Sequence, residues 1–394
     1  MNKRPVIVIS ATRFFQGGTL VIVKECLKFL SVHYSATHTI KALVYKKELY
    51  EDEGIRGIEW VEFPNSRKSV FHRLYDEYIN FYRLSKAWQP VLWLSLQDST
   101  PRVKARVKVV YYHNPLLLKP KAFKLWKHQF RLEILRLLYK YVYTKGIGTN
   151  DFVITQQTVI ADYLLKTYRL DIRKVWVFPP TDYLLNQGNS QHLVRQKEDI
   201  QTVKDNATSF NGTNPNPYTF IFPATAFYYK NQAVIIEACR ILQKQNPGLA
   251  YRVVLTIDGT ENKYVQKLVS KARKGLSQIA FIGFINRTEL FNYYYEADCM
   301  IFPSFLESWG LPLTEFAGLN KPIICADLPY GRSTLAGYNK VAYFDPTDAN
   351  LLANLMENAI CRTLNFHLTK TLAVTGFHYL GSWKECFDLL LRQR

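Results

Sequence analysis

Short apolar runs alternate with helical patterns along this chain, and that alternation limits its possible folds more than any other feature. The first run, Val6–Ser10, is rich in β-branched residues, as a buried parallel strand should be. A glycine-containing loop follows, and then residues 20–30 carry apolar side chains at helical spacing, with Thr19 as a suitable N-cap. Repeated strand–helix units of this kind predict α/β domains with doubly wound parallel sheets.

The same pattern recurs in both halves of the chain. Further strands are expected over residues 38–45, 58–63, 107–113, 151–156, 174–180, 218–224, 252–259, 279–284, 299–304 and 322–327. Helices are expected in the second half over residues 231–243, 261–274, 287–297 and 312–319.

A polar segment separates two runs of strand–helix units. Residues 186–217 are rich in Asn, Gln, Ser, Thr and Asp, as a linker or long surface loop is. A chain of 394 residues also exceeds the size of one compact core. We therefore expect Rossmann-like domains over 1–185 and 218–374, and a helix in 375–394 that packs back on the first domain. Because ligands bind beyond the carboxyl ends of parallel strands, the expected site is the cleft between the domains.

The formal charge of +19 indicates an anionic partner. The six cysteines form no C-x-x-C pair, which favours a reducing compartment without disulfides. No apolar stretch approaches the length of a membrane span, and the start of the chain lacks the long apolar region of a signal peptide. The expected location is the cytoplasm, with any membrane contact peripheral.

Two glutamates flank an expected helix start in the second half. Glu307 follows a strand, Gly310 permits an unusual backbone, and Pro312 suits the first helical position. Free N–H groups of Gly310 and Leu311 would hold a phosphate there, and Glu315 would point into the same space. Carboxylates that bond hydroxyls on either side of a phosphate site suit a nucleotide sugar. The alternative is that both glutamates are ordinary acids near a helix N-terminus.

The stretch "PSFLESWGLPLTEFAGLNKPII" resembles the signature of retaining GT-B glycosyltransferases of the family-4 type, the glycosyl transferases group 1. The positions that fit are Pro303, Ser304, Glu307, Gly310, Leu311, Pro312, Glu315 and Pro322. Phe316 and Asn320 depart from the usual Ala and Gly. The resemblance covers most of the chain and is most specific over residues 279–346. It implies the GT-B fold, in which two Rossmann-like domains face a cleft.

The resemblance implies a role for each matched residue in the second half. Glu307 would face the donor sugar, and the amides around Trp309, Gly310 and Leu311 would contact the sugar and diphosphate. Glu315 would accept bonds from the ribose hydroxyls. Lys230, between a strand and a helix, would offset the charge of the leaving diphosphate.

Other positions fit the family less specifically. The Arg that usually precedes Lys230 by a few residues is absent, so the leaving-group contacts differ or another cation replaces it. Gly17 and Gly18 match the family's glycine loop, whose amides approach the donor phosphate or the acceptor, although a glycine pair is most often just a turn. His113 matches the cleft histidine as a sugar or acceptor contact, and the alternative is a structural histidine.

The implied activity is retaining transfer of a hexose from a nucleoside-diphosphate sugar to a glycan or lipid-linked saccharide. Such a reaction belongs to surface polysaccharide or lipopolysaccharide assembly. The sequence has no D-x-D motif to hold a metal on the diphosphate, so we expect metal-independent transfer without a cofactor. Two alternatives stay open: a nucleotide-sugar epimerase of the same fold and, more distantly, a non-enzymatic basic membrane-surface protein.

A basic segment in the first half raises the question of membrane contact. Residues 102–145 contain twelve Lys or Arg and a single acid, Glu133. Within them, residues 123–141 place apolar side chains at helical spacing, with basic residues interleaved. Such a helix can lie on an anionic membrane, or it can be an ordinary domain helix with its apolar face in the core. No nucleic-acid-binding signature accompanies the charge, so nucleic acid is not an expected partner.

Overall fold

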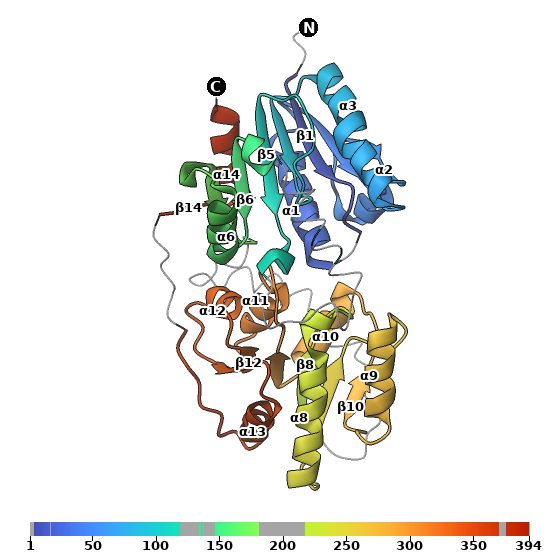
Figure 1. Cartoon of the computed structure of the whole chain (residues 1–394), viewed down its shortest axis with the longest axis vertical. Helices are drawn as coiled ribbons and strands as arrows, with labels where there is room; N and C mark the ends of the chain where they lie inside the picture. Colours follow the sequence, from blue (N-terminus) through green and yellow to red (C-terminus); the bar gives the residue numbers. More distant parts are fainter. Residues whose placement is uncertain are drawn as a thin grey trace. The chain divides into compact units, whose positions relative to one another are not determined.

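The computed structural model describes residues 4–15, 17–118, 134, 137, 146–180, 217–369 and 376–393. These residues form two compact units, of which the second comprises 217–369 and the first comprises the rest (Figure 1). Most of the polar segment 186–217 and nearly all of the basic helix expected over 123–141 lie outside the described residues. Both therefore stay predictions from the sequence.

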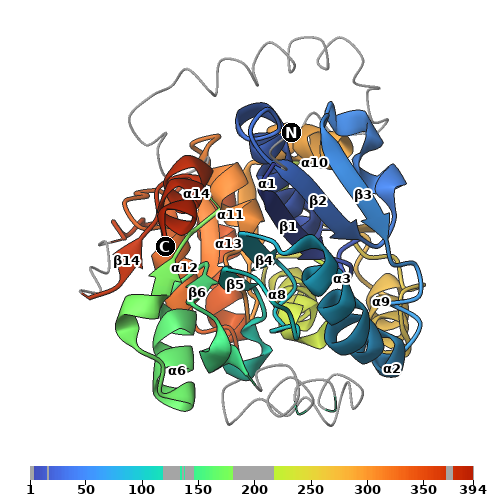
Figure 2. The ribbon, with the colours of Figure 1, turned by 90° about the horizontal axis from the view of Figure 1, so that it is seen from above.

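The first unit is built on an eight-stranded parallel sheet with the order β14-β7-β6-β5-β4-β1-β2-β3 (Figure 2). Its strands are β1 (Val6–Ala11), β2 (Thr39–Val44), β3 (Ile58–Glu62), β4 (Leu92–Ser95), β5 (Val107–Tyr112), β6 (Phe152–Thr155), β7 (Val175–Val177) and β14 (His378–Tyr379). Its α-helices are α1 (Gly17–His33), α2 (Val70–Tyr75), α3 (Phe81–Trp88), α6 (Thr158–Tyr168) and α14 (Trp383–Arg392). Short 3₁₀ segments are η1 (Lys47–Glu53), η3 (Pro115–Leu118), η5 (Ile147–Thr149) and η6 (Ile172–Lys174), and η2 (Asp76–Asn80) is a π-helical turn.

Both faces of this sheet are covered. Helices α1 and α14 bury one face, where Leu27 and Phe387 join a cluster with alternate residues of β1, β2 and β4. Helix α3 covers the other face, where Phe81 packs with Trp93 and Val8. β1 is buried along its whole length. A strand that is buried on both faces needs apolar side chains on both, so its sequence lacks the alternation of a half-exposed strand.

The second unit is a six-stranded parallel sheet with the order β10-β9-β8-β11-β12-β13. Its strands are β8 (Tyr218–Phe222), β9 (Tyr251–Leu255), β10 (Ile279–Phe281), β11 (Cys299–Phe302), β12 (Ile323–Ala326) and β13 (Val341–Phe344). Its helices are η9 (Tyr228–Lys230), α8 (Gln232–Gln245), α9 (Lys263–Arg273), α10 (Arg287–Glu296), α11 (Leu311–Ala317), α12 (Pro329–Thr334) and α13 (Ala349–Ile360). One continuous hydrophobic cluster joins the sheet to the helices that cover it.

Each sheet reverses its strand order once. In the second unit the chain moves outward from β8 to β10, then returns to lay β11 beside β8 and moves outward on the other side. In the first unit β4 returns to lie beside β1 in the same way. Loops that leave two neighbouring strands at such a reversal diverge, and the space between them is where ligands bind in open α/β sheets.

The structure confirms the α/β class and the two doubly wound parallel sheets expected from the sequence. The first helix differs in detail, because it begins at Gly17 rather than after a Thr19 cap. Gly17 has a φ of 74°, a backbone conformation that a side chain would strain, so the glycine allows the chain to turn into the helix earlier. Among the described residues, no helix is both long enough and apolar enough to span a membrane.

Candidate active site

The reversal point of the second sheet brings Lys230 and Glu307 together. Lys230 ends η9, which follows β8, and Glu307 follows β11. Since β8 and β11 are hydrogen-bonded neighbours, the two loops leave the sheet side by side although they are far apart in sequence. The Phe305 N–H donates to the Tyr229 carbonyl at 2.8 Å and ties the loops together.

Lys230 and Glu307 form a close ion pair where these two loops meet. The Lys230 ammonium donates to Oε1 of Glu307 at 2.6 Å, and their side chains are 16% and 10% exposed. An ammonium has three donors and a carboxylate has about four acceptor positions, so the pair satisfies only part of the capacity of each group. The remaining donors and acceptors can bond phosphate oxygens and hydroxyls of a ligand.

Asn231 fixes the backbone directly after Lys230. It has a φ of 59° and precedes α8 as its N-cap residue. Its buried side-chain amide donates to the carbonyls of Pro303 at 3.2 Å and Pro346 at 2.8 Å. Asn adopts this left-handed conformation more readily than most residues do. The Asn231 side chain therefore links the loops after β8, β11 and β13. These hydrogen bonds fix the backbone from which the Lys230 side chain extends.

The segment after Glu307 turns sharply into α11. Gly310 has a φ of 87°, and a Cβ at this position would lie 3.2 Å from Leu313 Cδ1 and 3.5 Å from Phe302 Cζ. Both the backbone conformation and the close packing therefore favour glycine. Leu311 is the first residue of the helix, and Pro312 is the second rather than the first as expected. Trp309 is buried, and its carbonyl accepts a hydrogen bond from the Thr334 hydroxyl.

Glu315 has partners different from those of Glu307. It lies in α11 and is buried. Oε2 of its carboxylate accepts a hydrogen bond from the Tyr294 hydroxyl, and Oε1 forms an ion pair with Arg287, both at 3.1 Å. Arg287 is the first residue of α10, and Tyr294 lies two turns later on that helix. The carboxylate is thus oriented by α10 and lies beside a guanidinium that is itself 44% exposed.

The remaining candidates lie in the first unit. Gly17 and Gly18 form the exposed start of α1, after β1, so their placement fits an amide loop beyond a strand end. His113 follows β5 and is 3% exposed. Its backbone N–H donates to Asp98, a residue with a positive φ of 65° in the loop after β4.

The His113 side chain is in a largely apolar setting. Its ring packs against Tyr111 with the ring centres 4.4 Å apart and against Phe14 at 5.6 Å. Burial lowers the pKa of His113 below its ordinary value, although the Asp98 carboxylate and the Leu96 carbonyl oppose that shift. His113 is therefore neutral near pH 7, and a neutral imidazole can both donate and accept a hydrogen bond.

Several residues that shape the site were not identified from the sequence. Asn231, Arg287 and Tyr294 each contact a candidate residue or the loop that holds one. Lys321 supports the same region, because its ammonium donates to the carbonyls of Tyr294, Tyr295 and Ala297 at the end of α10. The Asn before a helix start was a usable signal for Asn231, whereas the others depend on tertiary contacts. Within the described ranges, no group of three or more His, Cys, Asp or Glu side chains could hold a metal ion.

A comparison with known families found a match in the second half of the chain. Residues 203–362 match the family model described as glycosyl transferases group 1, a segment that includes Lys230, Glu307 and Glu315. This segment of the chain is similar to the glycosyl transferases group 1.

Two curated relatives and one solved structure place this domain among known proteins. The O-antigen chain mannosyltransferase RfbU of Salmonella typhimurium is 21% identical over 57% of this chain and 55% of its own length. The O-antigen chain mannosyltransferase C of Escherichia coli is 23% identical over 80% of this chain and 72% of its own. The match thus spans little more than half the length of the first relative.

Sucrose-phosphate synthase from Thermosynechococcus elongatus has a similar fold. The TM-score is 0.64 at 14% identity, over 99% of this chain and 97% of that one. This structural likeness extends the GT-B fold to both units of the chain, and at such low identity it concerns the fold alone.

Proposed function

We propose that this protein is a retaining glycosyltransferase that moves a hexose from a nucleoside-diphosphate sugar to a hydroxyl of a glycan or lipid-linked saccharide. The observation that carries the proposal is the ion pair between Lys230 and Glu307, at the strand reversal of the domain that matches the glycosyl transferases group 1. The pair combines a cation suited to a diphosphate with a carboxylate suited to a sugar hydroxyl.

The proposed mechanism assigns a separate task to each group. Lys230 bonds the diphosphate oxygens and stabilises the negative charge that develops as the sugar–phosphate bond breaks. The amides of Gly310 and Leu311 support the same phosphates. Glu307 accepts bonds from sugar hydroxyls and stabilises the positive charge that develops at the anomeric carbon. Transfer on the face that the diphosphate leaves keeps the anomeric configuration, and a departing phosphate oxygen takes the proton of the acceptor hydroxyl.

Glu315 is the group proposed to bind the ribose. Its carboxylate is already oriented by Tyr294 and Arg287, so the side chain need not change conformation when the ribose binds. Arg287 is 44% exposed and lies beside this carboxylate, where it can also contact the nucleotide. Gly17, Gly18 and His113 remain predicted donor or acceptor contacts from the first unit.

The relatives support an acceptor in surface polysaccharide assembly, because two of them are named O-antigen chain mannosyltransferases. A location at the inner face of the cytoplasmic membrane would suit such an acceptor if it is lipid-linked. The segment that suggested membrane contact, residues 123–141, lies almost entirely outside the described residues, so peripheral attachment stays a prediction from the sequence.

The proposal is tested by measuring transfer directly. Purified protein is screened against UDP-, GDP- and dTDP-sugars by thermal shift, and the donors that bind are then incubated with candidate saccharide acceptors. We expect at least one donor to raise the melting temperature, and we expect acceptor-dependent release of its nucleoside diphosphate. Product linkage determined by NMR should show the same anomeric configuration as the donor. An inverted product would contradict the retaining mechanism.

Metal independence is a separate expected result. Lys230 can neutralise diphosphate charge without a divalent cation, so the transfer rate with EDTA should lie within about twofold of the rate without it. Activity that EDTA abolishes and Mg²⁺ or Mn²⁺ restores would show that a metal performs the charge neutralisation assigned here to Lys230.

The nucleotide-sugar epimerase is the alternative function of the same fold. An epimerase needs a group that removes and returns a proton at C2 of the sugar, and no residue is assigned that task here. It would change the donor sugar without any acceptor. Consumption of donor that requires an acceptor therefore separates the two functions.

A further inference from the structure

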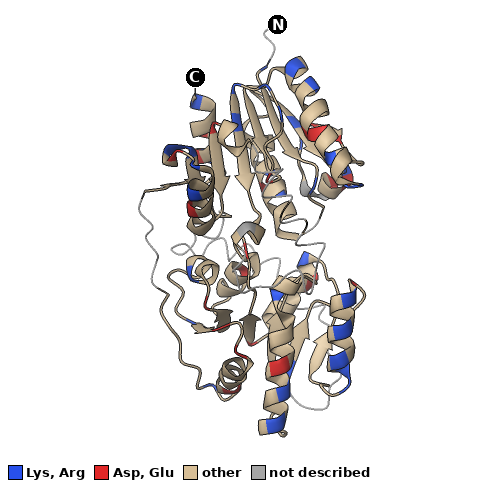
Figure 3. Ribbon diagram, in the orientation of Figure 1, with Lys and Arg blue, Asp and Glu red and all other residues tan. Residues whose placement is uncertain are grey.

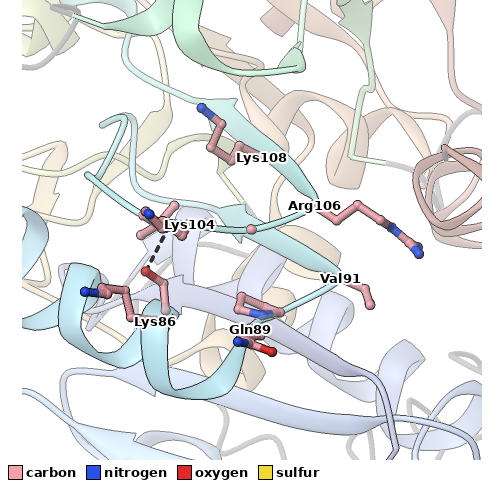
Figure 4. A pocket seen from close by; sticks show the side chains of 10 residues that line it. Lys86, Gln89, Val91, Lys104, Arg106 and Lys108 are labelled. Carbon is pink, nitrogen blue, oxygen red and sulfur yellow. Dashed lines mark hydrogen bonds between the residues drawn. The ribbon is translucent and has the colours of Figure 1, made fainter.

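A basic pocket in the first unit is lined by none of the residues proposed for sugar transfer. It is an open pocket of about 780 Å³ at the amino ends of β4 and β5 (Figure 4). Its walls come from the end of α3 and from the segments that lead into the two strands. Four lining residues are cations, namely Lys86, Lys104, Arg106 and Lys108, and none is an acid.

The sequence places three of these cations at alternate positions of one short segment that leads into β5. In "RVKARVK", residues 102–108, basic side chains alternate with apolar ones. Side chains alternate between the two sides of an extended chain. Val103 and Ala105 pack against the cluster that contains Phe81 and Trp93, so the intervening Lys104 lies on the opposite side. The segment is fixed to α3 because the Lys104 N–H donates to the Ser85 hydroxyl at 2.8 Å.

These cations lack carboxylate partners. Within the part of the chain that the structure describes, none of the four forms an ion pair, whereas Lys41, Arg73, Lys166 and Arg173 of the same unit each do. The Arg106 guanidinium has a long bond of 3.4 Å to the Leu391 carbonyl, and the Lys86 ammonium lies 5.7 Å from the Tyr82 ring. The nearby Asp151 accepts the backbone N–H of Lys108 rather than its ammonium.

Unpaired like charges around one concave surface repel one another and concentrate anions there. The Arg106 guanidinium supplies a planar fork that matches a phosphate, and the three lysines add mobile point charges. Gln89, which also lines the pocket, contributes an uncharged polar group. A single phosphate would engage only some of these groups, whereas two or more linked phosphates can engage them together.

We propose that this pocket binds a ligand carrying two or more linked phosphates, at a site distinct from the candidate active site. Within the first unit, the pocket and the candidate residue His113 lie at opposite ends of β5. The pocket is at the amino end of β5, and His113 is just beyond its carboxyl end. Six residues of strand separate these ends by about 20 Å. The phosphates can belong to a soluble compound or to a lipid head group, and the chemistry of recognition is the same for both.

Tripolyphosphate is the probe for the soluble source. Its binding to the full chain is measured by isothermal titration calorimetry at about 0.15 M salt, which screens weak surface attraction. The combined variant Lys86→Gln, Lys104→Gln and Arg106→Gln removes three exposed charges. We expect it to bind at least tenfold more weakly at this site, with an unchanged melting temperature.

Two controls separate this site from general attraction and from the active site. Lys263, Lys267 and Lys271 lie along one exposed side of α9 (Figure 3), and changing these three to Gln removes the same charge elsewhere. That control variant should keep the affinity. Lys230→Met should also keep it, so failure of the proposed transferase function would leave this result unaffected.

Vesicles test the lipid source. Co-sedimentation is compared for vesicles of phosphatidylcholine alone and with a diphosphate-bearing lipid. Binding that needs the diphosphate lipid and is lost in the triple variant would assign a lipid head group, whereas tripolyphosphate binding without vesicle binding would assign a soluble ligand. The proposal is wrong if neither probe binds, or if the triple variant and the α9 control bind equally.

Discussion

Changing Glu307 to Gln is expected to lower kcat/KM for sugar transfer about 100- to 1000-fold, as the loss of one aligned electrostatic contact to a transition state does. The substitution keeps the size of the side chain and removes its charge. Positive charge develops at the sugar carbon only as the bond to the diphosphate breaks, so the loss should fall on kcat. Nucleoside-diphosphate affinity should be unchanged or higher, because Lys230 is no longer held by a carboxylate.

Steady-state kinetics and calorimetry with the nucleoside diphosphate measure the two effects. Glu296→Gln is the matched control, because Glu296 is an exposed acid at the end of α10 in the same unit. It should retain full activity. Normal turnover by the Glu307→Gln variant would contradict the role proposed for this carboxylate, and an equal loss in both variants would point to a general effect of charge.

The fold could be predicted from sequence because buried parallel strands leave a strong signal. β1 is a continuous apolar run with the following helical pattern at the right distance, and most strands of both sheets look the same. β4 was missed although it lies next to β1 at the reversal of strand order. It has four residues, "LWLS", with no β-branched side chain, so its identity as a strand depends on pairing with β1 and β5.

The candidate site could be predicted in its residue types but not in its contacts. Lys230 and Glu307 were each placed after a strand, and both do follow one. Lys230 and Glu307 can form an ion pair because β8 and β11 are neighbours in the sheet. The two residues are 77 positions apart in the sequence, and that spacing does not reveal which strands are neighbours. Glu315 was expected near Glu307, but its observed partners are on α10, a contact that only the packed helices define.

The absence of the family's Arg before Lys230 is easier to understand in the structure. The loop carries Phe227 and Tyr229, whose rings stack 5.2 Å apart, and the Tyr229 carbonyl accepts the Phe305 N–H. Aromatic packing and a backbone bond therefore set the course of this loop. Lys230 is the cation that this loop places beside the loop after β11. We therefore expect Lys230 to balance a larger share of the negative charge of the diphosphate.

Lys230→Met is accordingly expected to weaken nucleoside-diphosphate binding at least tenfold and to lower kcat/KM about 100- to 1000-fold. Methionine keeps much of the aliphatic stem and removes the ammonium. The Glu307 carboxylate, at 10% exposure, then loses its cation and repels the incoming phosphates. Affinity for the uncharged nucleoside should not change, because the ammonium is proposed to contact only phosphates. Calorimetry with nucleoside, monophosphate and diphosphate measures this dependence.

Lys244→Met is the control for Lys230→Met, since Lys244 is exposed in the last turn of α8, and it should behave as the unchanged protein.

The combined Lys230→Met and Glu307→Gln variant should lose less activity than the product of the two single losses, because each single change already breaks the same ion pair. Losses that multiply would mean that the two groups act independently. An unchanged diphosphate affinity in Lys230→Met would show that another cation holds the leaving group, and Arg287 would then be the first residue to test.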